Sequence, residues 1–229
     1  VEGLDYNSKY YWRVKAKNQQ SESYWSDVWF FRTIFDTPVL REPPDSSINL
    51  PTEVTMKWAM TEGAESYEIR IATDSGFNDI VYEGATDDSI THTISLLEHF
   101  TTYYWQIRGV LADIEGYWTP AWRYTTIMKP AALNSPADST YNMPFEVKFE
   151  WAEYEEAENY HLQIATDPQF GNIIHEADDL TTLEYTHEGL EGCHTYYWRM
   201  RYLNGNHIGE WSEVRMFTTD MTPPEQTYP

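Results

Sequence analysis

One aromatic pattern occurs three times in this chain at a constant spacing of 93 residues. The occurrences are Tyr10-Tyr11-Trp12-Arg13, Tyr103-Tyr104-Trp105-Gln106 and Tyr196-Tyr197-Trp198-Arg199. Aligning residues 37–129 with residues 130–222 without a gap gives 34 identities in 93 positions, far more than chance would give. A repeat of this length constrains the fold strongly, because each copy must be a structural unit that recurs along the chain.

The phase of the repeat predicts the domain boundaries. Residues 37–129 and 130–222 are two complete copies, named the second and third copies from this point on. Residues 1–36, the first copy, match only the C-terminal part of a repeat, and residues 223–229 match the start of a further one. We therefore expect the chain to be a slice of a longer array, in which neighbouring modules of the same chain are the immediate partners.

Within each copy, hydrophobic residues recur with a period of two. Val54, Met56 and Trp58, for example, alternate with Thr55 and Lys57. Such alternation predicts strands with one buried face and one solvated face. Clusters of Pro, Gly, Asp and Asn separate the strands at short intervals, and no amphipathic helix of ten or more residues is visible. The sequence thus predicts an all-β protein in which each copy is a two-sheet antiparallel sandwich.

The residues of each copy resemble the fibronectin type III domain, in the variety common in large bacterial surface and secreted proteins. The resemblance implies tandem seven-stranded antiparallel β-sandwiches of immunoglobulin-like architecture without substantial helix. It implies a core Trp on an early strand, a core Tyr on the third strand, and a corner with Leu six residues before Tyr. These residues are Trp58 and Trp151, Tyr67 and Tyr160, and the corner pairs Leu4/Tyr10, Leu97/Tyr103 and Leu190/Tyr196. The resemblance also implies that the corner Tyr hydroxyl bonds the backbone just upstream.

A finer resemblance concerns a Trp that precedes the last strand of each copy. Trp25, Trp118 and Trp211 are similar to the Trp of the Trp–Arg stacking ladder in cytokine-receptor type III domains. The resemblance implies that Arg13 stacks on the Trp of the first copy and that Arg199 does so in the third. In the second copy Gln106 replaces this cation, so the resemblance implies the stacked pair only for the first and third copies. We interpret these residues as structural in every copy rather than as a platform for a ligand.

The sequence has no nucleophile motif, phosphate loop or dinucleotide fingerprint, so we expect no enzyme activity. The seven His residues do not recur at the 93-residue offset and are interpreted as scattered surface imidazoles. Cys193, in a corner loop, is expected to be half-buried and unreactive. Asp74 and Asp167 recur in register at strand ends and are expected to cap turns.

No cofactor is expected, and no metal site is predicted. The acidic pairs Asp87-Asp88 and Asp178-Asp179 and the Glu-rich run at 153–158 match no calcium-loop pattern. Calcium binding is therefore expected to be weak and non-specific.

Charge narrows the classes of partner. The chain has 15 Lys and Arg against 37 Asp and Glu, a formal net charge of -22, which repels nucleic acid and anionic membranes. No apolar run approaches the ~18 residues of a membrane span, so no membrane insertion is expected in this segment.

The function predicted from these observations is a non-catalytic spacer or adhesive segment of a large multi-repeat protein on the bacterial cell surface. Its expected location is extracellular, with a surface protein or a glycan as the further class of partner. The alternative is an accessory module array, binding carbohydrate or protein, in a secreted multidomain enzyme, or a part of a secretion or motility assembly.

Overall fold

A computed structural model describes residues 3–6, 8–87, 89–95, 97–112 and 114–221. Every regular element in these residues is a β-strand. Residue contacts divide the chain into two compact units: the first holds the first copy and nearly all of the second, and the other holds the third copy. Within the described ranges, no helix has the length and apolar character needed to cross a membrane. The predicted start of a further repeat at 223–229 lies outside these ranges.

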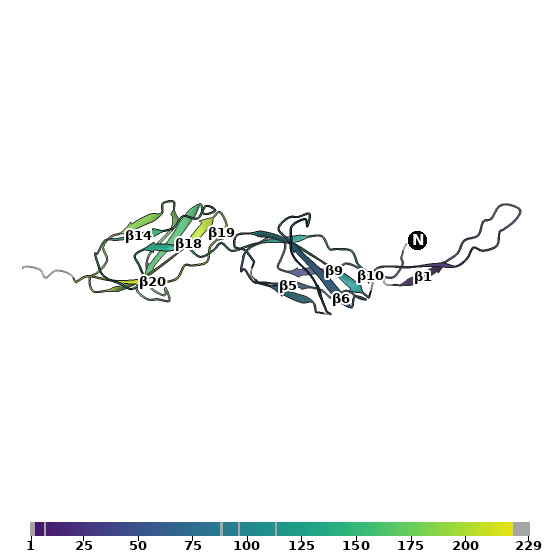
Figure 1. The fold of residues 1–229 in the computed structure, drawn as a ribbon, viewed down its shortest axis with the longest axis horizontal. Helices are drawn as coiled ribbons and strands as arrows, with labels where there is room; N and C mark the ends of the chain where they lie inside the picture. The colour runs from purple at the N-terminus through teal and green to yellow at the C-terminus, as the bar shows by residue number, and fades with distance from the viewer. Residues whose placement is uncertain (1–2, 7, 88, 96, 113, 222–229) are drawn as a thin grey trace, which may run out of the picture. The chain divides into compact units, whose positions relative to one another are not determined.

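The second copy has two sheets, one ordered β3-β5-β8 and the other ordered β4-β11-β9-β6-β7, with β10 paired to β9 (Figure 1). Its strands are β3 (Leu40–Glu42), β4 (Ser47–Leu50), β5 (Val54–Trp58), β6 (Ser66–Ala72), β7 (Ile80–Thr86), β8 (Thr91–Ile94), β9 (Thr102–Leu111), β10 (Ile114–Glu115) and β11 (Trp122–Thr126). The leading segment of the copy contributes to both sheets, since β3 lies in one sheet and β4 in the other.

The third copy repeats this arrangement, with sheets ordered β12-β14-β17 and β13-β20-β18-β15-β16 and with β19 paired to β18. Its strands are β12 (Leu133–Ser135), β13 (Thr140–Met143), β14 (Val147–Trp151), β15 (Asn159–Ala165), β16 (Ile173–Leu180), β17 (Glu184–His187), β18 (Thr195–Asn204), β19 (His207–Ile208) and β20 (Arg215–Thr219). The pairs are antiparallel except that β13 runs parallel to β20. Within its described residues each complete copy thus has nine strands, in a three-stranded and a six-stranded sheet, rather than seven, and the predicted all-β sandwich class is confirmed.

The period-two pattern of the sequence becomes the burial pattern of the strands. Along β9 the burial alternates from residue to residue, and Trp105 and Ile107 are completely buried. The equivalent strand β18 buries Trp198 and Met200 in the same way. Since successive side chains of a strand point to opposite faces, each of these strands has one face in the core and one face outward.

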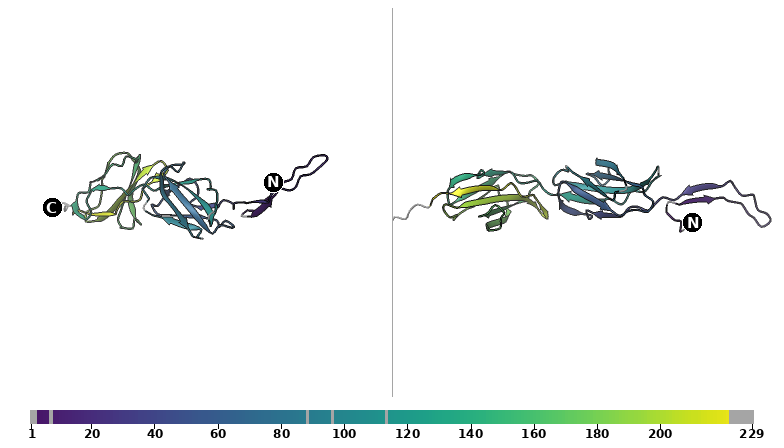
Figure 2. Two further views of the ribbon diagram at one scale, coloured as in Figure 1. Left: turned by 45° about the vertical axis from the view of Figure 1, so that its right-hand side comes forward. Right: turned by 90° about the horizontal axis from the view of Figure 1, so that it is seen from below.

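The first copy is represented by a two-stranded antiparallel hairpin, β1 (Lys9–Trp12) with β2 (Trp29–Arg32), in which Tyr10 lies opposite Phe31. Figure 2 shows it in purple as two paired strands joined by a long loop. Its aromatic side chains are exposed; Trp29, for example, is 65% exposed. In the second copy the residue equivalent to Phe31, Tyr124, is fully buried, because a second sheet there covers it.

An Asp carboxylate organises the turn after β6 and the turn after β15. Asp74 accepts backbone N–H bonds from Gly76, Asn78 and Asp79 at 2.7–2.9 Å. Asp167 accepts the same kind of bond from Gln169, Gly171 and Asn172. These bonds lower the pKa of both carboxyl groups, with the N–H of Asp79 the main cause at Asp74 and that of Gly171 at Asp167. The predicted turn-capping role is confirmed.

Candidate functional site

The predicted Trp and Tyr core residues lie inside the two complete sandwiches. Trp58 and Tyr67 are 2% and 1% exposed, and their rings meet edge to face at 5.5 Å between centroids. In the third copy Trp151 and Tyr160 are 1% and 5% exposed, and their rings are tilted at 48° with 5.7 Å between centroids. Edge-to-face contacts of this kind stabilise a core beyond the apolar area that they bury.

The corner Tyr residues bond the backbone just upstream in the first and third copies. The Tyr196 hydroxyl, in a ring that is 3% exposed, accepts a bond from the Glu191 N–H at 3.0 Å. The Tyr10 hydroxyl accepts one from the Asp5 N–H at 2.8 Å, in a partly exposed corner. Tyr103, the equivalent residue of the second copy, is 3% exposed.

In the first copy, Trp25 lies against two cations of its own hairpin. The guanidinium carbon of Arg13 is 4.5 Å from the ring centroid, and the ammonium of Lys15 is 5.2 Å from it. Glu22 binds Lys15 and also Lys17, the latter at 2.8 Å. All of these groups are solvent-exposed, so each contact contributes only a small part of the stability.

The second copy also has such a ladder, although Gln106 stands at the position of the implied cation. Trp118 lies between the guanidinium carbons of Arg70 and Arg108, at 4.4 and 4.6 Å from its ring centroid. Arg108 belongs to β9, whereas Arg70 belongs to the neighbouring strand β6, directly opposite Gln106. The cation missing from position 106 is therefore supplied by the adjacent strand.

In the third copy both cations come from β18. Arg199 and Arg201 lie 4.2 and 4.4 Å from the centroid of Trp211. The ring of Phe170 lies 3.9 Å from the guanidinium carbon of Arg199, so that this side chain has an aromatic ring as a second neighbour. Gln163 is directly opposite Arg199 on β15.

Sequence reasoning missed the second cation of each ladder. Lys15, Arg108 and Arg201 each lie two residues after the position that was considered, and residues two apart on a strand share a face. The alternation of side chains along the strand could therefore have identified Lys15, Arg108 and Arg201 as ladder cations. Arg70 had no such signal, because its position next to Trp118 depends on the pairing of β6 with β9.

The ladder cations of the second copy are neutralised by carboxylates of the same copy. Arg108 binds Glu68 through Nε and Nη2, at 2.7 and 2.5 Å, and Glu115 through Nη1 at 2.6 Å. Arg70 binds Glu83 at 2.6 Å. Arg108 is thus enclosed by two carboxylates, an arrangement in which hydrogen bonds are strengthened by charge.

In the third copy neutral side chains replace two of these charged groups: His161 stands in place of Glu68, and Gln163 in place of Arg70. The Nε of Arg201 donates to Nδ1 of His161 at 3.1 Å, so that nitrogen is an acceptor and the proton lies on Nε2. Nε2 in turn donates to Glu176 at 2.8 Å. Arg199 donates through Nε and Nη2 to the amide oxygen of Gln163, whose amide nitrogen donates to the same Glu176 oxygen. Two guanidinium groups are therefore linked to one carboxylate through neutral side chains.

Burial sets the protonation of this network. His161 is only 5% exposed beneath Trp211, whose ring centroid is 4.9 Å away, so it is not the surface imidazole expected from the sequence. Desolvation lowers the pKa of His161, and the charge of Arg201 lowers it further against the opposing effect of Glu176. The bonds from Gln163 and His161 lower the pKa of Glu176. At neutral pH His161 is neutral and Glu176 is charged.

The other groups with reactive chemistry do not converge. Cys193 is exposed, so the expectation that it is half-buried is wrong. Its backbone has a φ of 58°. The rings of His175 and His187 lie 4.7 Å apart at the edge of the third copy. In the described part of the chain, no three or more His, Cys, Asp or Glu side chains are placed to hold a metal ion. Of the acidic pairs weighed for calcium, Asp88 lies outside the described residues.

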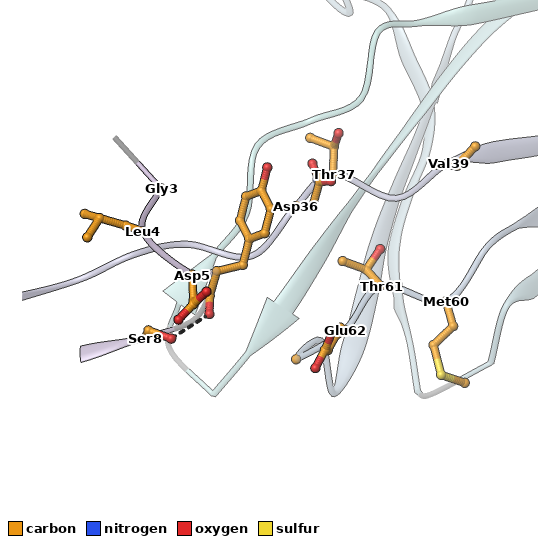
Figure 3. Close-up of a pocket in the computed structure, with 12 residues that line it drawn as sticks. Gly3, Leu4, Asp5, Ser8, Asp36, Thr37, Val39, Met60, Thr61 and Glu62 are labelled. Carbon is orange, nitrogen blue, oxygen red and sulfur yellow. Dashed lines mark hydrogen bonds between the residues drawn. The ribbon is translucent and has the colours of Figure 1, made fainter. Parts of the chain in front are cut away.

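A hollow of about 1020 Å³ lies between the first-copy segment and the start of the second copy (Figure 3). Its wall includes the carboxylates Asp5, Asp36 and Glu62 and the exposed side chain of Met60. The Ser8 hydroxyl is turned to the Tyr6 carbonyl at 2.9 Å. None of the twelve described residues that line the hollow is a His, Lys or Cys.

The strand order of each complete copy, a three-stranded sheet facing a larger sheet, is that of a fibronectin type III sandwich. No protein-family model matches the sequence, and no curated protein matches it. Among solved structures, the chain is similar to a two-domain fibronectin type III segment of chicken tenascin. The identity is 13%, with 80% of this chain and all of that one covered and a TM-score of 0.42.

It is also similar to the FN1–FN3 domains of chicken CNTN1 at 15% identity and a TM-score of 0.36. That match covers 95% of this chain and 77% of the other. Both scores are low, so the description of the fold depends on the strand order of each copy.

Proposed function

We propose that this segment is a non-catalytic structural spacer of a multi-repeat extracellular protein on a bacterial surface. The observation that carries the proposal is the ladder in every copy, in which Trp25, Trp118 and Trp211 lie on cations of their own copy. Aromatic rings that could otherwise bind a ligand thereby pack on cationic side chains of the same copy. A sandwich whose outward face is stabilised in this way suits a module that has to stay folded under load.

Single-molecule force spectroscopy on the 229-residue chain tests this role. Each complete copy should unfold in one event that releases about 280 Å of contour length, since ~93 extended residues replace a folded domain roughly 30 Å long. Two such events per chain are expected, with the same force in millimolar calcium and in chelator. Unfolding without discrete force peaks, or a force that rises strongly with calcium, would contradict a spacer that works without a ligand.

The sequence of the full gene that encodes this segment tests the proposed location on a bacterial surface. We expect further copies of the 93-residue repeat on the same chain, together with a secretion or anchoring segment. A glycosidase or protease domain in the same reading frame would instead support the alternative of an accessory array in a secreted enzyme.

A further inference from the structure

The outward faces of the second and third copies differ in how their ladder cations are neutralised. Arg108 and Arg201 are equivalent residues, and both lie on the Trp of their copy. The two carboxylates around Arg108 are replaced in the third copy: Glu68 corresponds to His161 and Glu115 to Ile208. The third copy therefore keeps the cation and loses both of its carboxylate partners.

Among the residues that the structure describes, several N–H groups of Arg199 and Arg201 have no protein acceptor. In the described residues Arg201 donates through Nε alone, to His161. Arg199 donates through Nε and Nη2 to a single oxygen of Gln163. Both Nη groups of Arg201 and Nη1 of Arg199 thus have no acceptor in the part of the chain that the structure describes. The two side chains are only partly buried, so these N–H groups are open to a ligand.

The two guanidinium groups are also held in place before any ligand arrives. Arg199 lies between the rings of Phe170 and Trp211, and Trp211 lies against Arg201. A long cationic side chain normally loses rotamer entropy when it binds, and stacking of this kind reduces that loss. The planar arrangement of donors in arginine matches carboxylate, sulfate and phosphate oxygens.

The local charge balance points to the sign of the ligand. The network around Arg199 and Arg201 contains one carboxylate, that of Glu176, among the described residues. Glu176 is hydrogen-bonded to His161 and Gln163 rather than to either Arg. The charge of Asp178 also acts on His161. The third copy as a whole has a net charge of -13, from 17 acidic and 4 basic residues. A long polyanion would be repelled by that surround, whereas a single small anion would not.

We propose that the third copy binds a compact oxyanion, a carboxylate or a sulfate group, on the guanidinium groups of Arg199 and Arg201 beside Trp211. The second copy shows the place of such a group, because the Glu115 carboxylate lies 2.6 Å from Nη1 of Arg108. A ligand oxygen takes the corresponding place on Arg201, where Ile208 offers none. This binding adds an adhesive contact to the spacer and does not depend on it.

Titration of the ¹⁵N-labelled chain by NMR tests the site with sodium sulfate, acetate and glucuronate, each against sodium chloride of equal ionic strength. The indole N–H of Trp211 and the side-chain N–H groups of Arg201 should shift saturably, with millimolar midpoints. The signals of Trp118 provide the internal control, since the second copy already has its own carboxylates. Tighter binding of glucuronate than of acetate would identify a sugar acid as the source of the carboxylate, and tighter binding of sulfate would identify a sulfate ester.

Four variants test which side chains hold the anion. R201Q should weaken binding at least tenfold, and R108Q should leave it unchanged. I208E, which places a carboxylate where Glu115 stands in the second copy, should abolish binding, whereas the uncharged I208Q should retain it. Equal shifts at Trp118 and Trp211, no saturable shift at all, or full binding by I208E would overturn the proposal. Because the force experiment involves no anion, a failure here leaves the spacer role untouched.

Discussion

His161 occupies the position that Glu68 occupies in the second copy, and the exchange alters the protonation chemistry of the outward face. Glu68 receives two bonds from Arg108 as a charged acceptor. His161 can accept from Arg201 only while Nδ1 has no proton. Protonation of this ring would set two donors against each other beside a second cation. The third copy therefore has a pH dependence that the second copy lacks at this position.

Stability of the third copy should fall as the pH decreases from about 6.5. Burial lowers the pKa of His161 below its ordinary value of 6.5, and desolvation lowers those of His175 and His187 too. The unfolded chain then binds more protons than the folded one below pH 6.5, so acid favours unfolding, and full stability is present above that pH. Urea unfolding followed by the Trp198 indole signal at pH 7.5, 6.0 and 5.0 measures this, and H161Q should flatten the slope. A midpoint independent of pH would contradict the expectation.

The corner hydroxyl of Tyr196 makes a second prediction about a single residue. Y196F removes the acceptor of the Glu191 N–H in a ring that is 3% exposed, and should cost about 1–2 kcal/mol of unfolding free energy. Y197F, on the outward face of the same strand, is the matched control and should change stability by less than ~0.5 kcal/mol. If chemical denaturation gave the same loss of unfolding free energy for Y196F and Y197F, the corner hydrogen bond would not contribute to stability as expected.

At the scale of strands, the two complete copies transpose one pair of residues. In the second copy β6 carries Arg70 and β9 carries Gln106, directly opposite each other. In the third copy β15 carries Gln163 and β18 carries Arg199, again directly opposite. The Trp of each copy keeps a cation against its ring, while the strand that supplies it changes. The pair, rather than either residue, is the unit that the ladder requires.

A double substitution tests whether the pair acts as a unit. R70Q alone should cost roughly 0.5–1 kcal/mol, because it removes one cation from Trp118. Adding Q106R should recover most of that loss by recreating the arrangement of the third copy. Thermal or urea unfolding of the wild type, both single variants and the double variant gives the coupling energy. Additive losses in the double variant would show that the transposition is coincidental.

The sequence alone was sufficient for the strands and insufficient for contacts between them. Alternation along a strand predicted the burial of Trp58, and the resemblance to the fibronectin type III domain implied the core position of Tyr67 and the corner position of Tyr196. The position of Arg70 on Trp118 could not be predicted, because Arg70 lies on another strand than Gln106, and strand register cannot be read from one segment. The exposure of Cys193 was missed because a loop has no such periodicity.

Over the whole molecule, the charge is unevenly divided among the copies. The first copy is neutral, the second has a net charge of -8 and the third has a net charge of -13. Since both complete copies share one fold, their difference in charge should appear as a difference in response to salt. Self-repulsion within a compact domain destabilises it, and salt screens that repulsion.

Lowering sodium chloride from 150 mM to 10 mM should therefore destabilise the third copy more than the second. The screening length grows from about 8 Å to about 30 Å over this range, so that charges across a whole domain begin to interact. Urea midpoints read separately from the Trp105 and Trp198 indole signals measure the two copies in one sample. Equal shifts, or a larger shift in the second copy, would argue that the acidic side chains are arranged so as to avoid one another.

The transposed pair also has a consequence for how an array of such repeats can change by genetic recombination. A crossover between the second and third copies that falls after residue 70 and before residue 106 joins one strand from each parent. One product then has Arg facing Arg and the other has Gln facing Gln. The first sets like charges opposite each other across a strand pair, and the second leaves the Trp with one cation fewer. Exchanges that keep both strands from one parent avoid this defect, so hybrids with junctions outside this window should be recovered folded more often.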